Sequence, residues 1–269
     1  MAKWRGLALL LLVALAVLVA PWLAPQNPYD LAALDIIDAR LPPFSHASNG
    51  PLTYWLGSDE QGRDLLSALL YGLRISLLVG VGGSFVAFAV GSMVGLWAGY
   101  RGGRSDALLM RLADLQLSFP ALLVALVLLA LLGPGLSKVV IALALSQWAW
   151  FARLARNEAR SLAGRDYVTA AHLAGVGEIR ILIRHIWPNA LPTLLTAWPV
   201  QLAAAITLEA TLSFLGLGAP VTQPSLGLLI ANGFQYLLSG QYWISLFPGL
   251  ALVLLLATLN AGADRLAKV

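Results

Sequence analysis

The sequence predicts an all-α membrane protein with six transmembrane helices. Of its 269 residues, 59% are hydrophobic and only 11% are charged. The mean hydropathy is +0.79, and the apolar residues gather in long uncharged runs. Because a soluble domain typically has about 25% charged residues, this composition excludes a soluble enzyme, a disordered chain and a fibrous repeat.

Six segments are candidates for membrane spans, each of which needs about 20 mostly apolar residues as a helix. The first could instead be a cleaved signal peptide, although its apolar run exceeds the usual length of about 7–15 residues. The fourth is short unless Lys138 extends its ammonium group out of the membrane. We expect Pro120 and Pro199 to kink their helices. The segments are Leu7–Leu23, Ile75–Tyr100, Leu115–Leu132, Val139–Ala152, Pro192–Leu215 and Trp243–Leu259.

The distribution of positive charge predicts that both termini are cytoplasmic. With the N-terminus inside, thirteen of the 17 Lys and Arg residues fall in cytoplasmic segments. The outer loop, residues 24–71, is acidic instead. Membrane topology therefore accounts for the excess of Lys and Arg over acidic residues, and we expect no nucleic-acid binding. The chain has no Cys, and its three His residues are far apart in the sequence, so we expect no disulfide, thiolate or metal site.

Two local patterns describe the chain around the second span. Ser58 and Gln61 have the spacing of a capping box, which predicts an amphipathic helix from about Leu65 on the outer membrane surface; a plain spacer is the alternative. Gly91, Gly95 and Gly99 stand four residues apart, so they share a helix face. This spacing of small residues predicts close packing against another helix.

The longest cytoplasmic segment, residues 153–191, carries six Arg side chains. Three of them, Arg153, Arg156 and Arg160, share one helix face. Beyond them, Tyr167–Gly175 is predicted to be a short helix that ends at Gly175, and a second helix over Glu178–Ile186 runs up to Pro188. Two short helices projecting from the membrane would form a docking knob. The alternative is a solvated basic loop that only enforces the topology.

Thr169, Ala170 and Ala171 are followed by Gly175, and Pro188 lies thirteen residues after that glycine. This pattern resembles the EAA motif of the membrane subunits of binding-protein-dependent ABC importers, and further stretches resemble the peptide/nickel permease family specifically. The likeness covers essentially the whole chain. The other matching stretches are LGSDEQGRDLLS at Leu56–Ser67, GYRGGRSD at Gly99–Asp106 through Phe119-Pro120, and EATLSFLGLG at Glu209–Gly218.

This resemblance implies a type I ABC importer transmembrane fold and a mechanism. Two permeases, usually different chains, pair around a central path, and an outer solute-binding protein delivers the substrate. Separate cytoplasmic ATPases bind ATP and Mg²⁺ and drive alternating access. The segment 167–177 would be the coupling helix seated on an ATPase. The predicted coupling residues are Asp166, Tyr167, Thr169, Ala170, Ala171, His172, Gly175 and Gly177.

The chain departs from the EAA motif at three positions. Thr169 replaces the usual Glu, His185 replaces Ile, and Trp187 replaces Leu. The missing Glu puts an acidic contact with the ATPase in doubt but leaves the helix and the glycine in place. The resemblance also implies a division into an N-terminal helix and outer loop (1–71), a permease domain (72–262) containing the 153–191 loop, and a short cytoplasmic tail (263–269).

Charged and polar residues inside the predicted spans are candidate functional residues. Glu209, in the fifth span near Ser213, could line the path, contact a partner permease, or be a protonated structural acid. Asp114 lies three residues after Arg111, which predicts an ion pair between them, and it could also border the path. No Lys follows a Gly, so the chain lacks a P-loop. We find no catalytic constellation and assign no catalytic residue.

Three function classes remain from the sequence. The first is an ABC importer permease in the cytoplasmic membrane of a bacterium or archaeon, surrounded by lipid, that carries dipeptides or oligopeptides, with nickel as the alternative substrate. The second is a proton-coupled secondary transporter in which Glu209 carries the proton. The third, an intramembrane enzyme or scaffold, would need a nucleophile or metal constellation. Replacing Gly175 by a bulky residue separates the first two classes.

Overall fold

The structure is a computed structural model that describes residues 19–30, 34–218, 220 and 222–267. Its secondary structure is almost entirely helical, which confirms the predicted fold class. Four helices are long and apolar enough to cross a membrane, and the bent pair α3 and α4 could form a fifth span. Most of the first predicted span, Leu7–Leu23, and the signal-peptide alternative lie outside the described residues, although residues 19–23 are helical.

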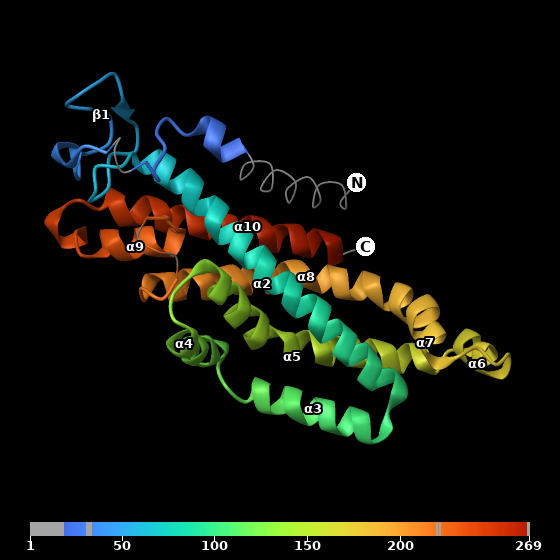
Figure 1. Cartoon of the computed structure of the whole chain (residues 1–269). Helices are drawn as coiled ribbons and strands as arrows, with labels where there is room; N and C mark the ends of the chain where they lie inside the picture. Colours follow the sequence, from blue (N-terminus) through green and yellow to red (C-terminus); the bar gives the residue numbers. More distant parts are fainter. Residues whose placement is uncertain (1–18, 31–33, 219, 221, 268–269) are drawn as a thin grey trace.

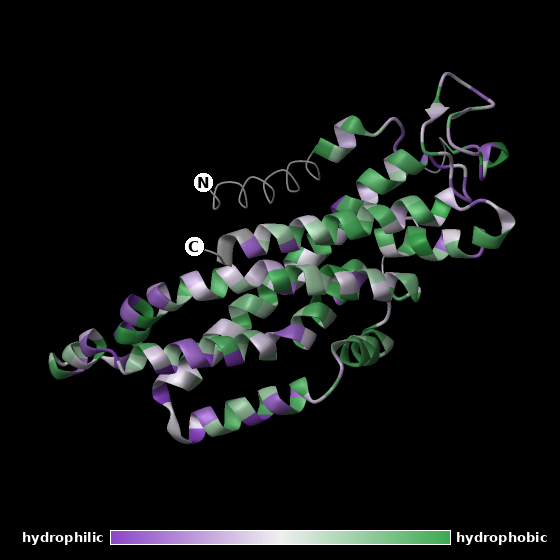
Figure 2. Ribbon diagram, turned by 180° about the vertical axis from the view of Figure 1, so that it is seen from behind, coloured by the Kyte–Doolittle hydropathy of each residue, from purple (hydrophilic) through white to green (hydrophobic). Residues whose placement is uncertain are grey.

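The long helices form one bundle, with α6 at one end and strand β1 at the other (Figure 1). The bundle helices are mainly hydrophobic, and hydrophilic residues occur along α3 and toward the α6 end (Figure 2). The helices are α2 (Leu65–Arg101), α3 (Gly103–Leu117), α4 (Ala121–Leu132), α5 (Leu136–Ala163), α6 (Asp166–Leu173), α7 (Glu178–Ile181), the π-helix η3 (Leu182–Ile186), α8 (Trp187–Phe214), α9 (Leu226–Phe234) and α10 (Trp243–Ala267).

Helices α2 and α5 pack backbone to backbone through the predicted glycine face. A Cβ atom placed on Gly91, Gly95 or Gly99 would overlap main-chain atoms of α5, the nearest being the carbonyl oxygens of Trp148, Ala152 and Arg156 respectively. Such contact is possible only where both surfaces lack bulky side chains. The prediction of close packing is therefore confirmed, with α5 as the partner helix.

The bundle continues through α8, which is longer than its predicted span. We expected a separate cytoplasmic helix to end before Pro188, and this was wrong. Instead, α7, η3 and α8 run on as one helix over Glu178–Phe214. Pro188 lies two residues after the π-helix η3, inside this continuous helix. Its missing N–H removes one hydrogen bond from the helical ladder, and the π-turn carries the chain across the junction. Pro199 lies inside the same continuous helix.

A short helix that the sequence did not reveal, α9, lies between α8 and α10. Ser225 caps it by accepting a hydrogen bond from the Leu228 N–H at 3.3 Å. Gly227 lies against the carbonyl group of Ala210 on α8, and Ser245 on α10 donates a hydrogen bond to the Ile230 carbonyl at 3.1 Å. The loop before α10 therefore packs on the bundle rather than serving as a simple connection.

The predicted third span, Leu115–Leu132, is not one helix. Helices α3 and α4 meet at an angle of 90°, and Pro120 is the residue at which α4 starts. The kink expected at Pro120 is thus confirmed, but it is a full break. Proline has no N–H for the helical ladder and clashes with the preceding turn, so an apolar run on both sides does not keep the helix straight.

The outer loop is tied together by buried polar groups. A short hairpin pairs β1 (Ser45–His46) with β2 (Thr53–Tyr54), and the 3-10 helix η2 covers Ile36–Asp38. Asp38 accepts hydrogen bonds from the Ser48 N–H at 3.0 Å and from the Tyr54 hydroxyl at 3.0 Å. Burial acts to raise the pKa of the Asp38 carboxyl, but the bonds from Ser48 and Tyr54 outweigh it and hold this pKa below its usual range.

The capping box predicted at Ser58 was wrong. Ser58 accepts a hydrogen bond from the Leu41 N–H at 2.7 Å and donates one to the Asp38 carbonyl, so its side chain binds other loop residues and does not cap a helix. Asp64 caps α2 instead, accepting from the Ser67 N–H at 2.8 Å. Helix α2 then continues from Leu65 without a break, so no separate surface helix forms, and α2 crosses the suggested boundary between 71 and 72.

Candidate functional site

Helix α6 ends in a specific turn at Gly175. Gly175 has φ +75°, and its N–H donates to the His172 carbonyl at 2.9 Å while the Val176 N–H donates to the Ala171 carbonyl at 3.0 Å. This pair of bonds is the Schellman motif, which needs a left-handed residue after the helix. Gly175 is therefore required by the backbone, and the predicted helix with its terminating glycine is confirmed.

One face of α6 packs and the other is exposed. Val168 is 1% exposed, and Ala171 and Val176 pack with it against the core cluster formed by α2, α5 and the α7–α8 helix. Leu173 is 86% exposed and Tyr167 is 40% exposed. Except for Ala171, which is half-buried, all the predicted coupling residues are exposed: Asp166, Tyr167, Thr169, Ala170, His172, Gly175 and Gly177. The structure thus forms a knob, defined here as residues 165–177.

Two aromatic contacts join the knob to the bundle. The Tyr100 hydroxyl, at the end of α2, lies 2.9 Å from the His172 Nε2 atom, and the two rings stack with centroids 5.9 Å apart. The ring centroids of Tyr167 and His185 are 6.4 Å apart. Both α2 and the α7–α8 helix therefore contact the knob.

The arginine face predicted on α5 is used for ion pairs with α3. Asp106, which is 4% exposed, accepts hydrogen bonds from Arg156 at 2.8 Å and Arg160 at 2.6 Å. Arg153 binds Asp114, with 3.0 Å between its Nε atom and the carboxyl oxygen. The predicted pair between Arg111 and Asp114 was therefore wrong, because α3 turns Asp114 toward α5.

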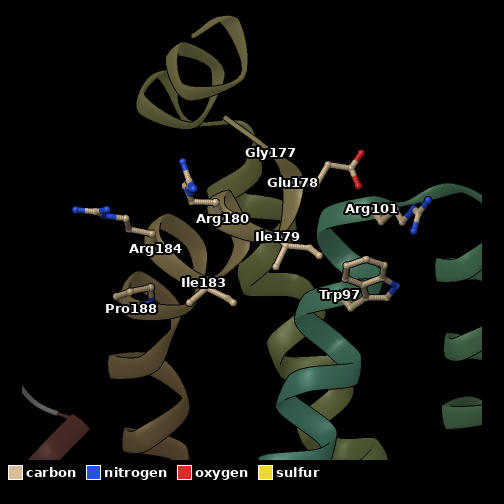
Figure 3. Close-up of a pocket in the computed structure, with 9 residues that line it drawn as sticks. All are labelled: Trp97, Arg101, Gly177, Glu178, Ile179, Arg180, Ile183, Arg184 and Pro188. Carbon is tan, nitrogen blue, oxygen red and sulfur yellow. The ribbon is translucent and has the colours of Figure 1, made fainter. Parts of the chain in front are cut away.

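A cavity of about 1100 Å³ opens beside the knob, between the end of α2 and the start of the α7–α8 helix. Figure 3 shows Trp97 and Arg101 on one side and Arg180, Arg184 and Pro188 on the other, with Ile179 and Ile183 between them. The Arg101 guanidinium lies over the Trp97 ring, 5.2 Å from its centroid. The cavity is thus lined by both helices that contact the knob.

Glu209 and Ser213 lie far along α8, away from the knob. Both side chains are 1% exposed, and the Ser213 hydroxyl donates to the Glu209 carboxyl at 2.7 Å. Ser76 and Ser225 are close neighbours of the same carboxyl. The structure therefore places Glu209 inside the single chain, close to α2 and to the loop before α9, and it places Asp114 on an exposed ion pair with Arg153.

Sequence reasoning missed three residues of this region. Leu173 lies within the predicted coupling helix, but its 86% exposure depends on which face of α6 packs. Trp97 and Arg101 were assigned only to a span and to the topology count, yet they line the cavity beside the knob. The sequence held one signal for Leu173, namely that this apolar residue lies on the side of α6 opposite Val168.

The structure is a bundle of long apolar helices, as in a membrane protein, and it carries an exposed helical knob at one end. The family model that describes the binding-protein-dependent transport system inner membrane component matches residues 91–269. The chain belongs to this family, and the resemblance found in its motifs is confirmed.

Relatives extend the likeness to nearly the whole chain. The di/tripeptide transport system permease protein DppC of Pseudomonas aeruginosa is 37% identical over 97% of this chain and 84% of its own length. The probable D,D-dipeptide transport system permease protein DdpC of Escherichia coli is 36% identical over 95% and 82%. The nickel transport system permease protein NikC of Escherichia coli is 33% identical over 98% and 93%.

A solved structure supports the fold independently. The inward-facing MetNI methionine ABC transporter matches with a TM-score of 0.60, covering 75% of this chain and 95% of the matched chain at 20% identity. At this identity the match concerns the fold alone, and it confirms the type I importer architecture.

Proposed function

We propose that this chain is a permease subunit of an ATP-driven importer that moves dipeptides or short oligopeptides across the cytoplasmic membrane. The observation that carries this proposal is the knob: a helix that ends in the Gly175 turn, with Leu173 exposed at its end. A surface of this kind suits a cytoplasmic partner. The peptide assignment is supported by the DppC and DdpC relatives.

In this proposal, the knob is the coupling element. An ATPase subunit would bind the exposed face of α6, with Leu173 as the apolar anchor and Tyr167, Thr169 and Ala170 around it. ATP and Mg²⁺ would be held by the ATPase and not by this chain. Closure of the ATPases would push the knob, and the contacts of Tyr100 and Val168 would carry that motion to α2 and the α7–α8 helix.

The remaining partners and the orientation follow from the same proposal. A second permease, different in sequence, would pair with this chain around the path, and a solute-binding protein would deliver peptide on the outer side. The termini and the knob would be cytoplasmic, as the excess of Lys and Arg predicts. The outer loop, tied by Asp38, Ser58 and Asp64, would face the binding protein.

Nickel is the second candidate substrate, because NikC matches 98% of this chain at 33% identity. Peptide is the better supported of the two, since the more similar DppC and DdpC relatives are peptide permeases by name.

The experiment isolates the tagged chain gently from its native membrane and identifies co-purifying proteins by mass spectrometry. We expect a second permease, one or two ATPases and a solute-binding protein. The complex is then reconstituted into vesicles, and ATP-dependent uptake of a tritium-labelled dipeptide is compared with uptake of radioactive nickel. Dipeptide uptake is the expected result; nickel uptake alone would replace peptide by nickel, and a complex without an ATPase would contradict the importer function.

A further inference from the structure

A second cavity, of about 480 Å³, lies within the membrane-spanning part of the bundle, among α3, α4, α5 and α8. All of the residues that line it are uncharged, yet several are polar. The polar lining residues are Ser146 and Gln147 on α5 and Gln201, Thr207 and Thr211 on α8. Trp150 and apolar side chains from α3 and α4 complete the wall.

The strongest observation concerns Gln147. Its side chain is 6% exposed, and its Oε1 atom has no hydrogen-bond partner among the residues that the structure describes. A buried polar atom without a partner is costly and uncommon in folded proteins, and the cost is greater in a bilayer, where water is absent. Gln147 therefore carries one unmet hydrogen bond at the wall of the cavity.

Gln201 supports the same conclusion from the opposite wall. It is the fifteenth of the 28 residues of α8, so it lies at the middle of that helix. Together with Ala204, Thr207 and Thr211, it follows the three- and four-residue spacing of one helix face. A lipid-facing stripe would be apolar, so this face is suited to a polar ligand or a polar passage.

The hydrogen-bonding groups of the cavity match those of a peptide backbone. The hydroxyl protons of Ser146, Thr207 and Thr211 are used within their own helices, on the Leu143, Ala203 and Thr207 carbonyls at 2.8–3.0 Å. Their oxygen lone pairs remain able to accept from an N–H group, and the two glutamine amides both donate and accept. A peptide bond presents one N–H and one C=O, and a glutamine amide can bind both.

A charged pair lies on the same face toward the cytoplasmic end. On α5, Gln147, Trp150 and Arg153 are three residues apart, which places them on one side of the helix. Arg153 and its partner Asp114 are 53% and 50% exposed and line a smaller cavity of about 330 Å³. These two groups could exchange partners with the carboxylate and ammonium of a peptide that leaves the neutral cavity.

We propose that the cavity between Gln147 and Gln201 is a subsite of the transport path that binds the peptide backbone through uncharged amides. This inference rests on the proposed peptide transport function and adds its location and chemistry. Because the contacts are to the backbone, the subsite accepts peptides of different side chains. Because it carries no charge, it holds the peptide weakly enough for release.

The test uses the complete complex isolated from its membrane and reconstituted into vesicles. Gln147→Leu and Gln201→Leu are compared with the wild type and with Asn260→Leu, which removes an exposed amide from α10. The quantities measured are the recovery of the partner subunits and the tritium-labelled dipeptide taken up per ATP hydrolysed. We expect about a tenfold loss of uptake per ATP for each glutamine variant, with full subunit recovery and no change for Asn260→Leu.

Direct contact is tested by photo-crosslinking. Ala204→benzoylphenylalanine, on the cavity wall, should capture labelled dipeptide in the working complex, and Val253→benzoylphenylalanine, which is 61% exposed on α10, should not. Unchanged dipeptide uptake per ATP in both glutamine variants would refute the proposed subsite without contradicting the proposed peptide transport function. Loss of the second permease from those variants would mean that the amides bind that subunit instead. A wild-type complex without dipeptide uptake would refute the proposed function itself.

Discussion

The glycines of α2 and the glycine that ends α6 differ in what surrounds them. Gly91, Gly95 and Gly99 touch main-chain atoms of α5, so a Cβ atom has no room there. A Cβ atom on Gly175 would meet nothing within 4 Å, and the residue is needed only for its φ of +75°. The first region uses its small residues for contacts inside the chain. The second leaves one face of α6 exposed.

The same difference applies to the ion pairs. Asp106 is 4% exposed and binds two arginines, whereas the Arg153–Asp114 pair is half-exposed on both sides. Substitution of a residue with buried contacts inside the chain should lower the free energy of unfolding. Substitution of an exposed residue should instead impair coupling or transport.

Gly95→Ala should strongly destabilise the bundle. Its added methyl group would overlap the Ala152 carbonyl, which is main chain and cannot move aside easily. We expect a loss of about 3 kcal/mol of unfolding free energy, seen as a lower thermal midpoint in detergent. Gly82→Ala is the control, because its Cβ would lie an ordinary 3.6 Å from Val140. Equal midpoints for the two variants would contradict the close packing.

Asp106→Asn should destabilise the chain by about 2 kcal/mol. Removing one charge of a buried pair typically costs about 3–5 kcal/mol, and the 51% exposure of Arg160 reduces this loss. Asp114→Asn should cost at most about 1 kcal/mol, since its pair with Arg153 is screened by solvent. Denaturation of both variants in the same detergent gives the comparison. A larger loss of unfolding free energy for Asp114→Asn than for Asp106→Asn would contradict the view that the buried ion pair is the more stabilising one.

Gly175→Val should impair coupling while the bundle stays folded. A left-handed backbone costs a branched residue about 1–2 kcal/mol, so the end of α6 would change position without disturbing the core. Gly175→Asn should retain more activity, because asparagine tolerates this conformation, and Gly164→Ala serves as the control because its Cβ would lie an ordinary 4.0 Å from the Ser161 carbonyl oxygen. The measurement is peptide-stimulated ATP hydrolysis by the reconstituted complex. Full stimulation with Gly175→Val would exclude the knob from coupling.

The smallest expected effect is the acid response of the outer loop. The pKa of Asp38 is held below its ordinary value of 3.8, so its carboxylate stabilises the fold above that pH. This contribution is lost as the pH falls through 3.8 and then through the lower folded value. Burial raises the pKa of Asp59 and acts in the opposite direction. Asp38→Asn should therefore flatten the drop of the thermal midpoint on acidification; an unchanged drop would contradict this role.

The sequence alone predicted those features that depend on local spacing. The long apolar runs, the glycine face of α2 and the glycine turn after α6 were visible because helix periodicity and turn geometry involve neighbouring residues. The positions of the helix ends were harder to predict from the sequence. The apolar residues from Leu65 onward continue directly into the second span, and a π-turn, which has no clear sequence signal, joins α7 to α8.

Contacts between distant segments could not be predicted. Asp114 pairs with Arg153, which is 39 residues away, rather than with Arg111 in its own helix. The cavity between Gln147 and Gln201 likewise depends on how α5 faces α8. Glu209 was identified as a functional candidate from its charge, but its burial beside Ser213 is set by the packing of α2, α8 and α9.

The central claim is that the exposed face of α6 binds an ATPase. Since the chain contains no Cys, Leu173→Cys provides a single reactive thiol on the knob, and Leu238→Cys provides one on the exposed 3-10 helix η4 (Leu237–Ser239) between α9 and α10. Maleimide labelling of each is measured in the isolated permease and in the full complex. We predict that position 173 is protected in the complex and position 238 is not; equal labelling of position 173 in both states would contradict the claim.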